Sequence, residues 1–229
     1  MKKVLIGLSV GASLLLAGAV NVFAGDGLGI GVTLSNVSLD ASGTETEGGE
    51  TNSKSLSRTF QMGSLFAEFT KGPFTVGINH VPFKANVSDT TLTRTDTETS
   101  GAYGATAAET SLTQLQAAQA RILDHNTVYA ELGSKIYAKV GYVSVTVETQ
   151  ESLGTGSTYG NVDLDGFVYG LGIKGDWDSG AFAKLEAVMT DYDSLDVTSG
   201  VARAGVSTNN KITADLDTTA INLSMGYKF

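Results

Sequence analysis

Hydrophobic and polar residues alternate with a period of two along most of the chain, which is the pattern of β-strands whose two faces meet different surroundings. The last segment is the clearest, because Ile221, Leu223, Met225, Tyr227 and Phe229 all fall on one face and the residues between them are small or polar. Eight such segments lie near residues 28–35, 64–69, 74–79, 128–133, 136–142, 166–174, 183–189 and 220–229. An even number of strands is typical of a closed up-and-down barrel whose two chain ends lie on the same side.

The connections between these segments alternate strictly in length. Short turns are expected at 71–73, 133–135 and 176–180, and long polar connections at 40–58, 85–124, 149–161 and 193–210. A barrel that crosses a membrane has tight turns on the periplasmic side and large loops outside, whereas a soluble sandwich does not require this alternation. The sequence therefore predicts an all-β fold, an eight-stranded antiparallel up-and-down transmembrane β-barrel with short periplasmic turns and long extracellular loops.

The polar face of the predicted strands would line the interior of the barrel. Eight strands enclose a space just wide enough to be filled by their own side chains. Most residues on this face are glycine, serine or threonine, but six are ionisable: Glu68, Glu131, Lys139, Lys174, Lys184 and Glu186. Unpaired charges in so narrow a space would be costly. We therefore expect a charge network in the lumen in which these three acids and three bases satisfy one another.

Aromatic residues gather at two levels of the predicted barrel. Phe69, Phe74, Trp177 and Phe229 lie beside the short turns, and Phe60, Phe83 and Phe167 lie nearer the long loops. Two such levels indicate aromatic girdles at the two membrane interfaces.

The first 24 residues have the pattern of a secretory signal peptide. Lys2 and Lys3 are followed by an apolar run, and Val22-Phe23-Ala24 offers a cleavage site of small residues. We expect residues 1–24 to be removed on export and residues 25–229 to form the outer-membrane barrel. An uncleaved membrane anchor is the alternative, but the apolar run is diluted by glycine and serine.

Composition excludes several classes of function. The chain has no cysteine, which rules out disulfides, thiol catalysis and cysteine-rich zinc sites. Its net charge of −9 argues against nucleic acid as a partner, since phosphate binding needs a basic face. We expect no cofactor.

The last strand carries the most specific likeness to a known family. An exported chain with eight alternating strands that ends in Tyr227-Lys228-Phe229 resembles the small outer-membrane β-barrels of Gram-negative bacteria, of the OmpX, OmpW and OmpA transmembrane-domain type. In that family the alternating, aromatic-ended last strand is the signal read by the barrel-assembly machinery. The resemblance therefore implies that Ile221, Leu223, Met225, Tyr227 and Phe229 form an assembly signal. The alanine- and glutamine-rich stretch 104–123 departs from the family; its spacing of Leu112, Leu115, Gln119 and Ile122 fits either a short loop helix or plain disorder.

Candidate catalytic and metal sites are weak. Neither His80 nor His125 has an obvious acid and nucleophile partner in the sequence with which to form a catalytic relay. Barrel lipid A deacylases carry a His-x-Ser pair on the outer wall, but the residue two after His80 is Pro82 and not serine. The acidic groups Asp191, Asp193 and Asp196, and Glu45, Glu47 and Glu50, do not match a calcium loop. We predict no catalytic, cofactor-binding or metal-binding residues.

The interpretation we favour is a non-enzymatic outer-membrane barrel that anchors acidic surface loops and serves envelope integrity, adhesion or surface recognition. Its partners would be outer-membrane lipids and lipopolysaccharide, the barrel-assembly machinery, and an extracellular ligand held by the loops. A narrow, porin-like passive channel for small solutes is the first alternative, and a secreted soluble β-sandwich is the second.

Overall fold

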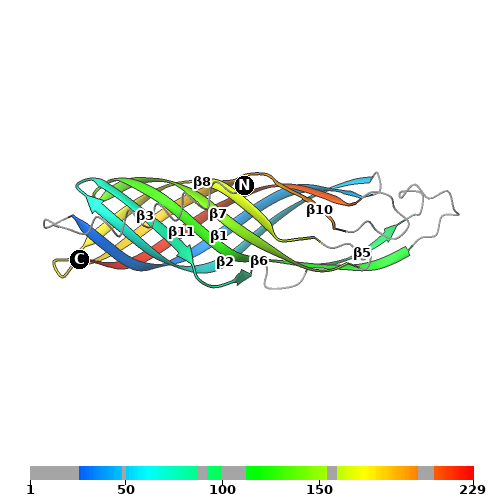
Figure 1. Ribbon diagram of the computed structural model, residues 1–229, viewed down its shortest axis with the longest axis horizontal. Coiled ribbons are helices and arrows are strands. Elements are labelled where there is room, and N and C mark those ends of the chain that lie inside the picture. Colours follow the sequence, from blue (N-terminus) through cyan, green and yellow to red (C-terminus); the bar gives the residue numbers. More distant parts are fainter. Residues whose placement is uncertain (1–25, 48–49, 87–91, 99–111, 154–158, 201–208) are drawn as a thin grey trace.

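The computed structural model describes residues 26–229, apart from 48–49, 87–91, 99–111, 154–158 and 201–208 (Figure 1). The predicted signal peptide, residues 1–24, lies outside the described residues. The strands are β1 (Gly27–Glu47), β2 (Glu50–Lys71), β3 (Phe74–Val81), β4 (Ala85–Asn86), β5 (Leu92–Glu98), β6 (Leu112–Gly133), β7 (Ile136–Leu153), β8 (Val162–Asp176), β9 (Ala181–Tyr192), β10 (Leu195–Thr198) and β11 (Lys211–Lys228). Among the residues that the structure describes, no helix is long and apolar enough to cross a membrane.

These strands form one closed antiparallel sheet. Neighbours follow the order β1-β2-β3-β6-β7-β8-β9-β11, and β1 pairs with β11 from Gly29↔Lys228 to Thr46↔Lys211, which closes the barrel. The short strands β4 and β5 pair with β6 beyond the end of β3, and β10 pairs with β11 beyond the end of β9. The prediction of an eight-stranded antiparallel barrel is therefore confirmed.

The three predicted short turns lie together at one end of the barrel. Gly72, Gly133 and Gly180, one in each turn, have positive φ angles of 58°, 132° and 91°, a backbone conformation that favours glycine. The Phe229 N–H donates a hydrogen bond to the Leu28 carbonyl, so the C-terminus is tied to the same end (Figure 1). We call the half of the barrel nearest these turns the lower half and the other the upper half.

The long connections are shorter than predicted, because much of their sequence continues the barrel wall. β1 and β2 stay paired up to Glu47↔Glu50, so the predicted loop at 40–58 is almost wholly a hairpin. The loops predicted at 85–124, 149–161 and 193–210 are likewise partly strand. Polar cross-strand contacts line this extension, such as the Thr44 and Thr213 hydroxyls at 2.8 Å, and such pairs stabilise strands that stand in water.

Neither the short loop helix nor the plain disorder considered for 104–123 is found where the structure describes these residues. Residues from Leu112 onwards belong to β6, which pairs with β5 from Leu92↔Ala118 to Glu98↔Leu112 and with β7 on its other side. Pairing on both sides of the strand outweighs the helical spacing of its apolar residues. Residues 104–111 lie outside the described part of the chain.

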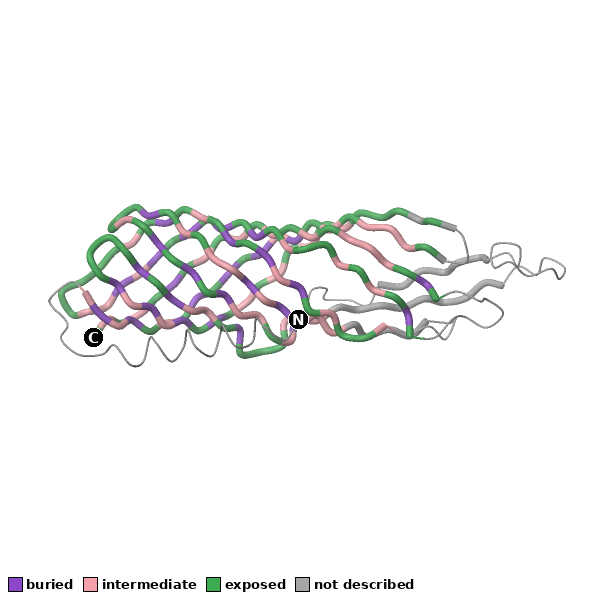
Figure 2. The backbone as a smooth tube through the Cα atoms, turned by 45° about the horizontal axis from the view of Figure 1, so that its top comes forward, coloured by how far each residue is buried: buried purple, intermediate pink, exposed green. Residues whose placement is uncertain are grey.

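The outer face of the lower half is covered by exposed apolar side chains. Leu171 is 67% exposed, Val140 61% and Leu223 53%. Residues between them along each strand point inward and are buried or half-buried, and Figure 2 shows this alternation along the lower half. We call this outward set the belt: Ile30, Val32, Leu34, Leu65, Phe74, Val76, Val128, Leu132, Ile136, Val140, Phe167, Tyr169, Leu171, Ile173, Leu185, Met189, Ile221, Leu223, Met225 and Tyr227. So wide an apolar surface fits hydrocarbon and not water, so the lower half is a transmembrane barrel.

Candidate functional site

The six ionisable residues predicted for the lumen lie together in the interior of the lower half. Lys184 Nζ contacts Glu68 and lies 2.9 Å from Glu131 Oε2, while Lys139 Nζ lies 2.6 Å from Glu186 Oε1 and 3.5 Å from Glu131 Oε1. Lys174 Nζ completes the set at 3.4 Å from Glu68 Oε1. The arrangement brings together residues of β2, β6, β7, β8 and β9. We call this group the floor.

Aromatic residues complete the floor. The Tyr129 hydroxyl donates to Glu68 at 3.0 Å and the Tyr137 hydroxyl to Glu186 at 2.9 Å. Lys139 Nζ lies 4.2 Å from the centre of the Tyr129 ring, and Lys174 Nζ lies 4.4 Å from that of Phe182. Three lysines and three glutamates then balance in charge, and each carboxylate accepts from at least one lysine. The floor is therefore a filled, neutral cross-section.

Two interior glycines show how closely the floor is packed. A Cβ atom on Gly77 would lie 2.5 Å from the Tyr129 ring, and one on Gly172 would lie 2.3 Å from the Tyr137 ring. Only glycine lets these tyrosines lie flat against the neighbouring wall and reach their carboxylates. The small residues of the polar face thus make room for the floor.

Above the belt the outer face becomes polar around the whole circumference. Beyond the belt, and beyond Gly63, Ile78 and Tyr142 on three of the strands, each barrel strand presents a polar outward residue: Asn36, Gln61, His80, Asn126, Ser144, Asp165, Asp191 and Thr219. Acidic residues stand side by side there, since Asp217 pairs with Asp40 on one side and with Asp191 on the other. The upper half of the wall therefore stands in water or among lipid headgroups.

The inner face changes in the opposite sense at about the same level. Ile122, Val145 and Leu164 are buried there and form an apolar cluster, against which Phe60, Met62, Val147, Val162, Leu195 and Leu216 pack. Those on β2, β7, β8 and β11 share the strand face that carries glycine, threonine and charge in the lower half. Ile122 reaches the interior through an irregularity of β6 between Ile122 and Asp124. The upper interior is thus apolar, and the lower interior is polar.

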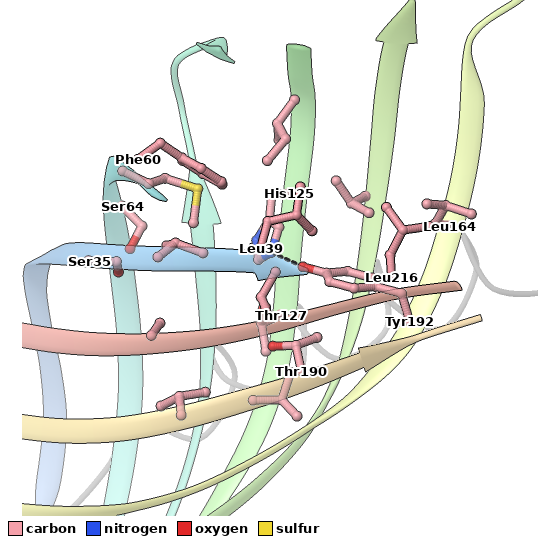
Figure 3. Close-up of a pocket in the computed structure, with 18 of the residues that line it drawn as sticks. Ser35, Leu39, Phe60, Ser64, His125, Thr127, Leu164, Thr190, Tyr192 and Leu216 are labelled. Atoms are coloured by element: carbon pink, nitrogen blue, oxygen red, sulfur yellow. Dashed lines mark hydrogen bonds between the residues drawn. The ribbon is translucent and has the colours of Figure 1, made fainter. Parts of the chain in front are cut away.

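An open cavity of about 400 Å³ lies in this upper interior, and we call it the chamber (Figure 3). Its apolar upper part is lined by Leu39, Phe60, Leu164 and Leu216, and the floor residues Lys139, Lys184 and Glu186 bound it below. Such a volume falls within the range of about 300–1,000 Å³ that is common for small-molecule sites. The chamber is the best candidate for a binding site in the described structure.

A hydrogen bond crosses the chamber. His125 Nε2 lies 3.3 Å from the Tyr192 hydroxyl, and Figure 3 shows the two side chains reaching toward each other from β6 and β9. These strands are not neighbours in the sheet, because β7 and β8 lie between them. The contact therefore spans the lumen between the apolar zone above and a zone of hydroxyl groups below, which includes Ser35, Ser64 and Thr127 (Figure 3).

The wall beside the chamber is not fully paired. β2 pairs with β3 only from Lys71↔Phe74 to Leu65↔His80, and the part of β2 above Leu65 has no strand partner on that side among the described residues. A second cavity lies at this place, lined by Gln61, Gly63, Val81, Phe83, Lys84, Ala85 and neighbouring residues. Phe60 and Met62 line both cavities. The two cavities therefore lie on either side of this part of β2, just above the belt.

The remaining predicted residues fall at separate places. Phe60, predicted for the upper aromatic girdle, points into the chamber, so that prediction is wrong; the outward pair Tyr142 and Phe167, with ring centres 5.7 Å apart, lies at that level. His80 lies on the outer face with its Nδ1 2.7 Å from Asn126 Oδ1, and His125 lies one register position away on the inner face, so the two histidines share no site. The assembly-signal residues Ile221, Leu223, Met225, Tyr227 and Phe229 face outward along β11. In the described residues, no three His, Asp or Glu side chains are grouped as metal ligands.

Sequence reasoning missed the chamber, although its signal is present. Along β11 the apolar residues are odd-numbered from Ile221 onwards, but Leu216 and Ile212, which come earlier, are even-numbered. The apolar series therefore moves from one face of the strand to the other. β7 does the same, because Val140 and Tyr142 face outward while Val143, Val145 and Val147 face inward. If a single solvent surrounded the barrel, such a switch of the apolar residues from one face to the other would indicate the end of the strand. If lipid surrounds one part of the barrel and water the other, the same switch indicates an apolar interior in the water-facing part.

A solved structure shares this architecture. The outer membrane protein OprG of Pseudomonas aeruginosa aligns with 90% of this chain and 98% of its own, with 13% identity and a TM-score of 0.50. AlkL, whose structure was determined in lipid bilayers, gives 15% identity, 93% and 96% coverage and a TM-score of 0.47, and the outer membrane protease OmpT of Escherichia coli gives 8%, 92% and 99%, and 0.44. No protein-family model and no curated protein sequence matches the chain. The likeness to OprG shows the fold, that of an outer-membrane β-barrel, and nothing about what the chain binds.

Proposed function

We propose that this outer-membrane β-barrel takes up small apolar solutes from outside the cell, holds them in the chamber and releases them sideways into the membrane. Burying apolar surface stabilises a bound solute by roughly 25 cal/mol per Å². The chamber supplies such a surface above the belt, where the outside of the wall is polar. No chemical step is needed, and we propose that the protein is not an enzyme.

The observation that carries this proposal is the change of the inner face from polar to apolar above the floor. If the barrel served only as an anchor for surface loops, an apolar cavity of about 400 Å³ in its upper interior would have no use. The side cavity at Phe60 and Met62 offers the exit, because it lies directly above the lipid-facing belt.

A passive axial channel for polar solutes is the competing function. It would require a water path through the floor, where the lysines and glutamates contact each other directly. We expect planar-bilayer recordings of the refolded protein to show no discrete conductance steps. Regular steps that grow when Lys184 is replaced by Met would favour the axial channel instead.

The exit can be tested by filling the side cavity. Gly63 lines it, and a Cβ atom at Gly63 would meet nothing within 4 Å, so Gly63→Trp adds bulk without a backbone clash. We expect cells that make Gly63→Trp to take up an apolar fluorescent probe such as N-phenyl-1-naphthylamine several-fold more slowly than cells with the unaltered protein. Binding of the same probe to the purified barrel should change little.

Gly175→Trp is the matched control, since a Cβ atom there also meets nothing within 4 Å and the residue lies on β8 beside the lower turns. It should leave both uptake and binding unchanged. Equal uptake rates for Gly63→Trp, Gly175→Trp and the unaltered barrel would contradict a sideways exit, and no probe binding to any of them would contradict the whole proposal.

The partners of the barrel follow from the division of its outer face into an apolar belt and a polar part above it. We propose that outer-membrane lipids cover the belt, that lipopolysaccharide meets the acidic outer surface above it, and that the barrel-assembly machinery reads the last strand. The exposed apolar row on β11 and the adjacent carboxylates Asp40, Asp191 and Asp217 support these assignments.

A further inference from the structure

The chamber has two chemically different zones. Its upper zone is the apolar cluster around Ile122, Val145 and Leu164. The lower zone, between that cluster and the floor, is lined by hydroxyl and amide side chains: Thr33, Ser35, Ser64, Asn79, Thr127, Thr190, Asn222 and Ser224. A ligand that fills both zones must therefore be apolar at one end and polar at the other.

Two side chains of the lining carry polar atoms that are enclosed yet have no hydrogen-bond partner among the described residues. They are His125 Nδ1 and Asn222 Oδ1. His125 uses its other ring nitrogen for the contact with Tyr192, so the imidazole is held at the boundary of the zones while Nδ1 stays without a partner. Leaving a buried donor or acceptor unsatisfied costs about 1–3 kcal/mol, so a ligand group that hydrogen-bonds to it gains binding free energy.

The ionisable groups beneath this zone do not offer a free charge. Lys139 and Lys184 at the base of the chamber already contact Glu186, and Glu68 and Glu131, respectively. In this lower zone a charged head group would have to break one of these pairs or remain buried without a counter-ion, and both are costly. Arg58, the remaining cation of the lining, pairs in register with Leu39 and so lies in the upper zone. An uncharged group that can both donate and accept a hydrogen bond avoids that cost, and an amide oxygen such as Asn222 Oδ1 needs a donor.

We infer that the natural solute of the chamber is an uncharged amphiphile with a hydroxyl-type head, bound with its apolar tail up and its head down in the polar zone. His125 and Tyr192 bound this zone above, and Asn222, which pairs in register with Glu186, bounds it below. The apolar cluster holds the tail, as the proposed function requires, and the polar zone selects for one polar group at its end. This inference rests on the proposed function and narrows the class of solute.

The test uses three probes with the same chain length: n-octane, 1-octanol and octanoate. Binding to the refolded barrel in lipid nanodiscs is measured by isothermal titration calorimetry, with empty nanodiscs subtracted to remove partition into lipid. We expect 1-octanol to bind at least fivefold more tightly than either of the other probes, because one hydrogen bond to a group that is otherwise unsatisfied is worth about that factor.

Two variants remove the polar contacts without removing the chamber. Asn222→Leu replaces the amide by an apolar group of similar size, and Tyr192→Phe removes only a hydroxyl. Each should reduce the preference for 1-octanol over octane about fivefold, while octane binding stays the same or improves. Tyr169→Phe is the control: it also removes one tyrosine hydroxyl, but from the outward belt, and should have no effect. Heat-modifiable mobility on a detergent gel shows that each variant is folded.

A direct readout comes from the imidazole itself. In ¹⁵N spectra of the barrel, the ring nitrogens of His125 should shift when 1-octanol is added and stay in place when octane is added. His80, on the outer face, serves as the internal reference.

The outcomes separate the inference from the proposed function. If octane and 1-octanol bind equally well and Asn222→Leu changes neither, the chamber is an unselective apolar site and the inference is wrong. If octanoate binds most tightly, the head is anionic, which also overturns it. If none of the probes binds, the proposed function fails together with the inference.

Discussion

The lower and upper halves of the barrel use the same backbone in opposite ways. On β11, Leu223 faces outward with 53% of its surface exposed, whereas Leu216, seven residues earlier on the same unbroken strand, packs inward against the apolar cluster. An odd separation puts two strand residues on opposite faces. The register with β1 does not change between the two positions, since β1 accompanies β11 throughout. The surrounding solvent, and not the strand, therefore decides which face is apolar.

The difference also separates two ways of stabilising a barrel. In the lower half, hydrocarbon covers the belt, every backbone group is paired by closure of the sheet, and charges fill the interior because they can satisfy one another there. In the upper half, water covers the outside, so burial of apolar side chains inside is the main favourable contribution. An apolar interior that is not completely filled is what remains to bind a solute.

The largest effect is expected when a floor charge is reversed. Lys184→Glu places a third carboxylate beside Glu68 and Glu131 in a buried site, and a broken buried pair costs about 3–5 kcal/mol or more when like charges replace it. Denaturant unfolding in lipid vesicles and heat-modifiable mobility measure the loss. The matched control is Lys211→Glu, which breaks the exposed pair with Asp196 at 2.8 Å and should cost less than about 1 kcal/mol. Equal losses in the two variants would show that the floor does not stabilise the barrel.

The next largest effect concerns the position of the membrane boundary on the outer face. Val32→Arg and Asn36→Arg are the same kind of change on the same strand and face, four residues apart. A lipid-facing arginine near the bilayer centre costs about 2–4 kcal/mol, and one near the interface about 0–1 kcal/mol. Unfolding in vesicles should therefore separate the two variants clearly. If both are tolerated equally, Val32 does not face lipid and the boundary has been drawn in the wrong place.

Much of the fold could be predicted from the sequence because period-two alternation and turn lengths are local properties. The belt face of the last strand and the six floor residues follow from parity alone, since a charge such as Glu131 on a glycine-rich face has few alternatives in a narrow barrel. Parity also places His80 on the outward face of its strand, with Phe74 and Val76. These inferences require no knowledge of which residues meet across the barrel.

The chamber could not be predicted from the same rules. The phase change near Thr218 is visible in the sequence, but it is compatible with a strand that ends there as well as with an interior that turns apolar. Only the continued pairing of β1 and β11 up to Thr46↔Lys211 decides between the two. The contact of His125 with Tyr192 and the end of β2–β3 pairing at Leu65↔His80 likewise depend on strands that meet in three dimensions.

A smaller effect is expected inside the upper half, where the faces are inverted. Leu164 is buried in the apolar cluster, and Asp165 is the next residue, on the outer face of the same strand. Leu164→Ser should cost about 1.5–3 kcal/mol, the value of burying a leucine side chain, and should weaken probe binding to the chamber. Asp165→Ser should change neither by more than about 0.5 kcal/mol. The reverse order of losses would mean that the upper half does not have an apolar core.

The smallest effect on stability, and the most specific one in cells, concerns the two rims of the belt. Phe229 at the lower rim is 64% exposed and packs against Tyr227 with ring centres 5.2 Å apart, and Phe167 at the upper rim is 62% exposed and packs against Tyr142 at 5.7 Å. Because each ring has one aromatic contact and a similar exposure, Phe229→Ala and Phe167→Ala should each cost about 0.5–1.5 kcal/mol in refolded protein. If the last strand is read by the assembly machinery, Phe229→Ala alone should lower the amount of heat-modifiable barrel in the outer membrane several-fold. Equal amounts of the two variants in cells would remove the terminal aromatic from any role in assembly and leave it as one more belt residue.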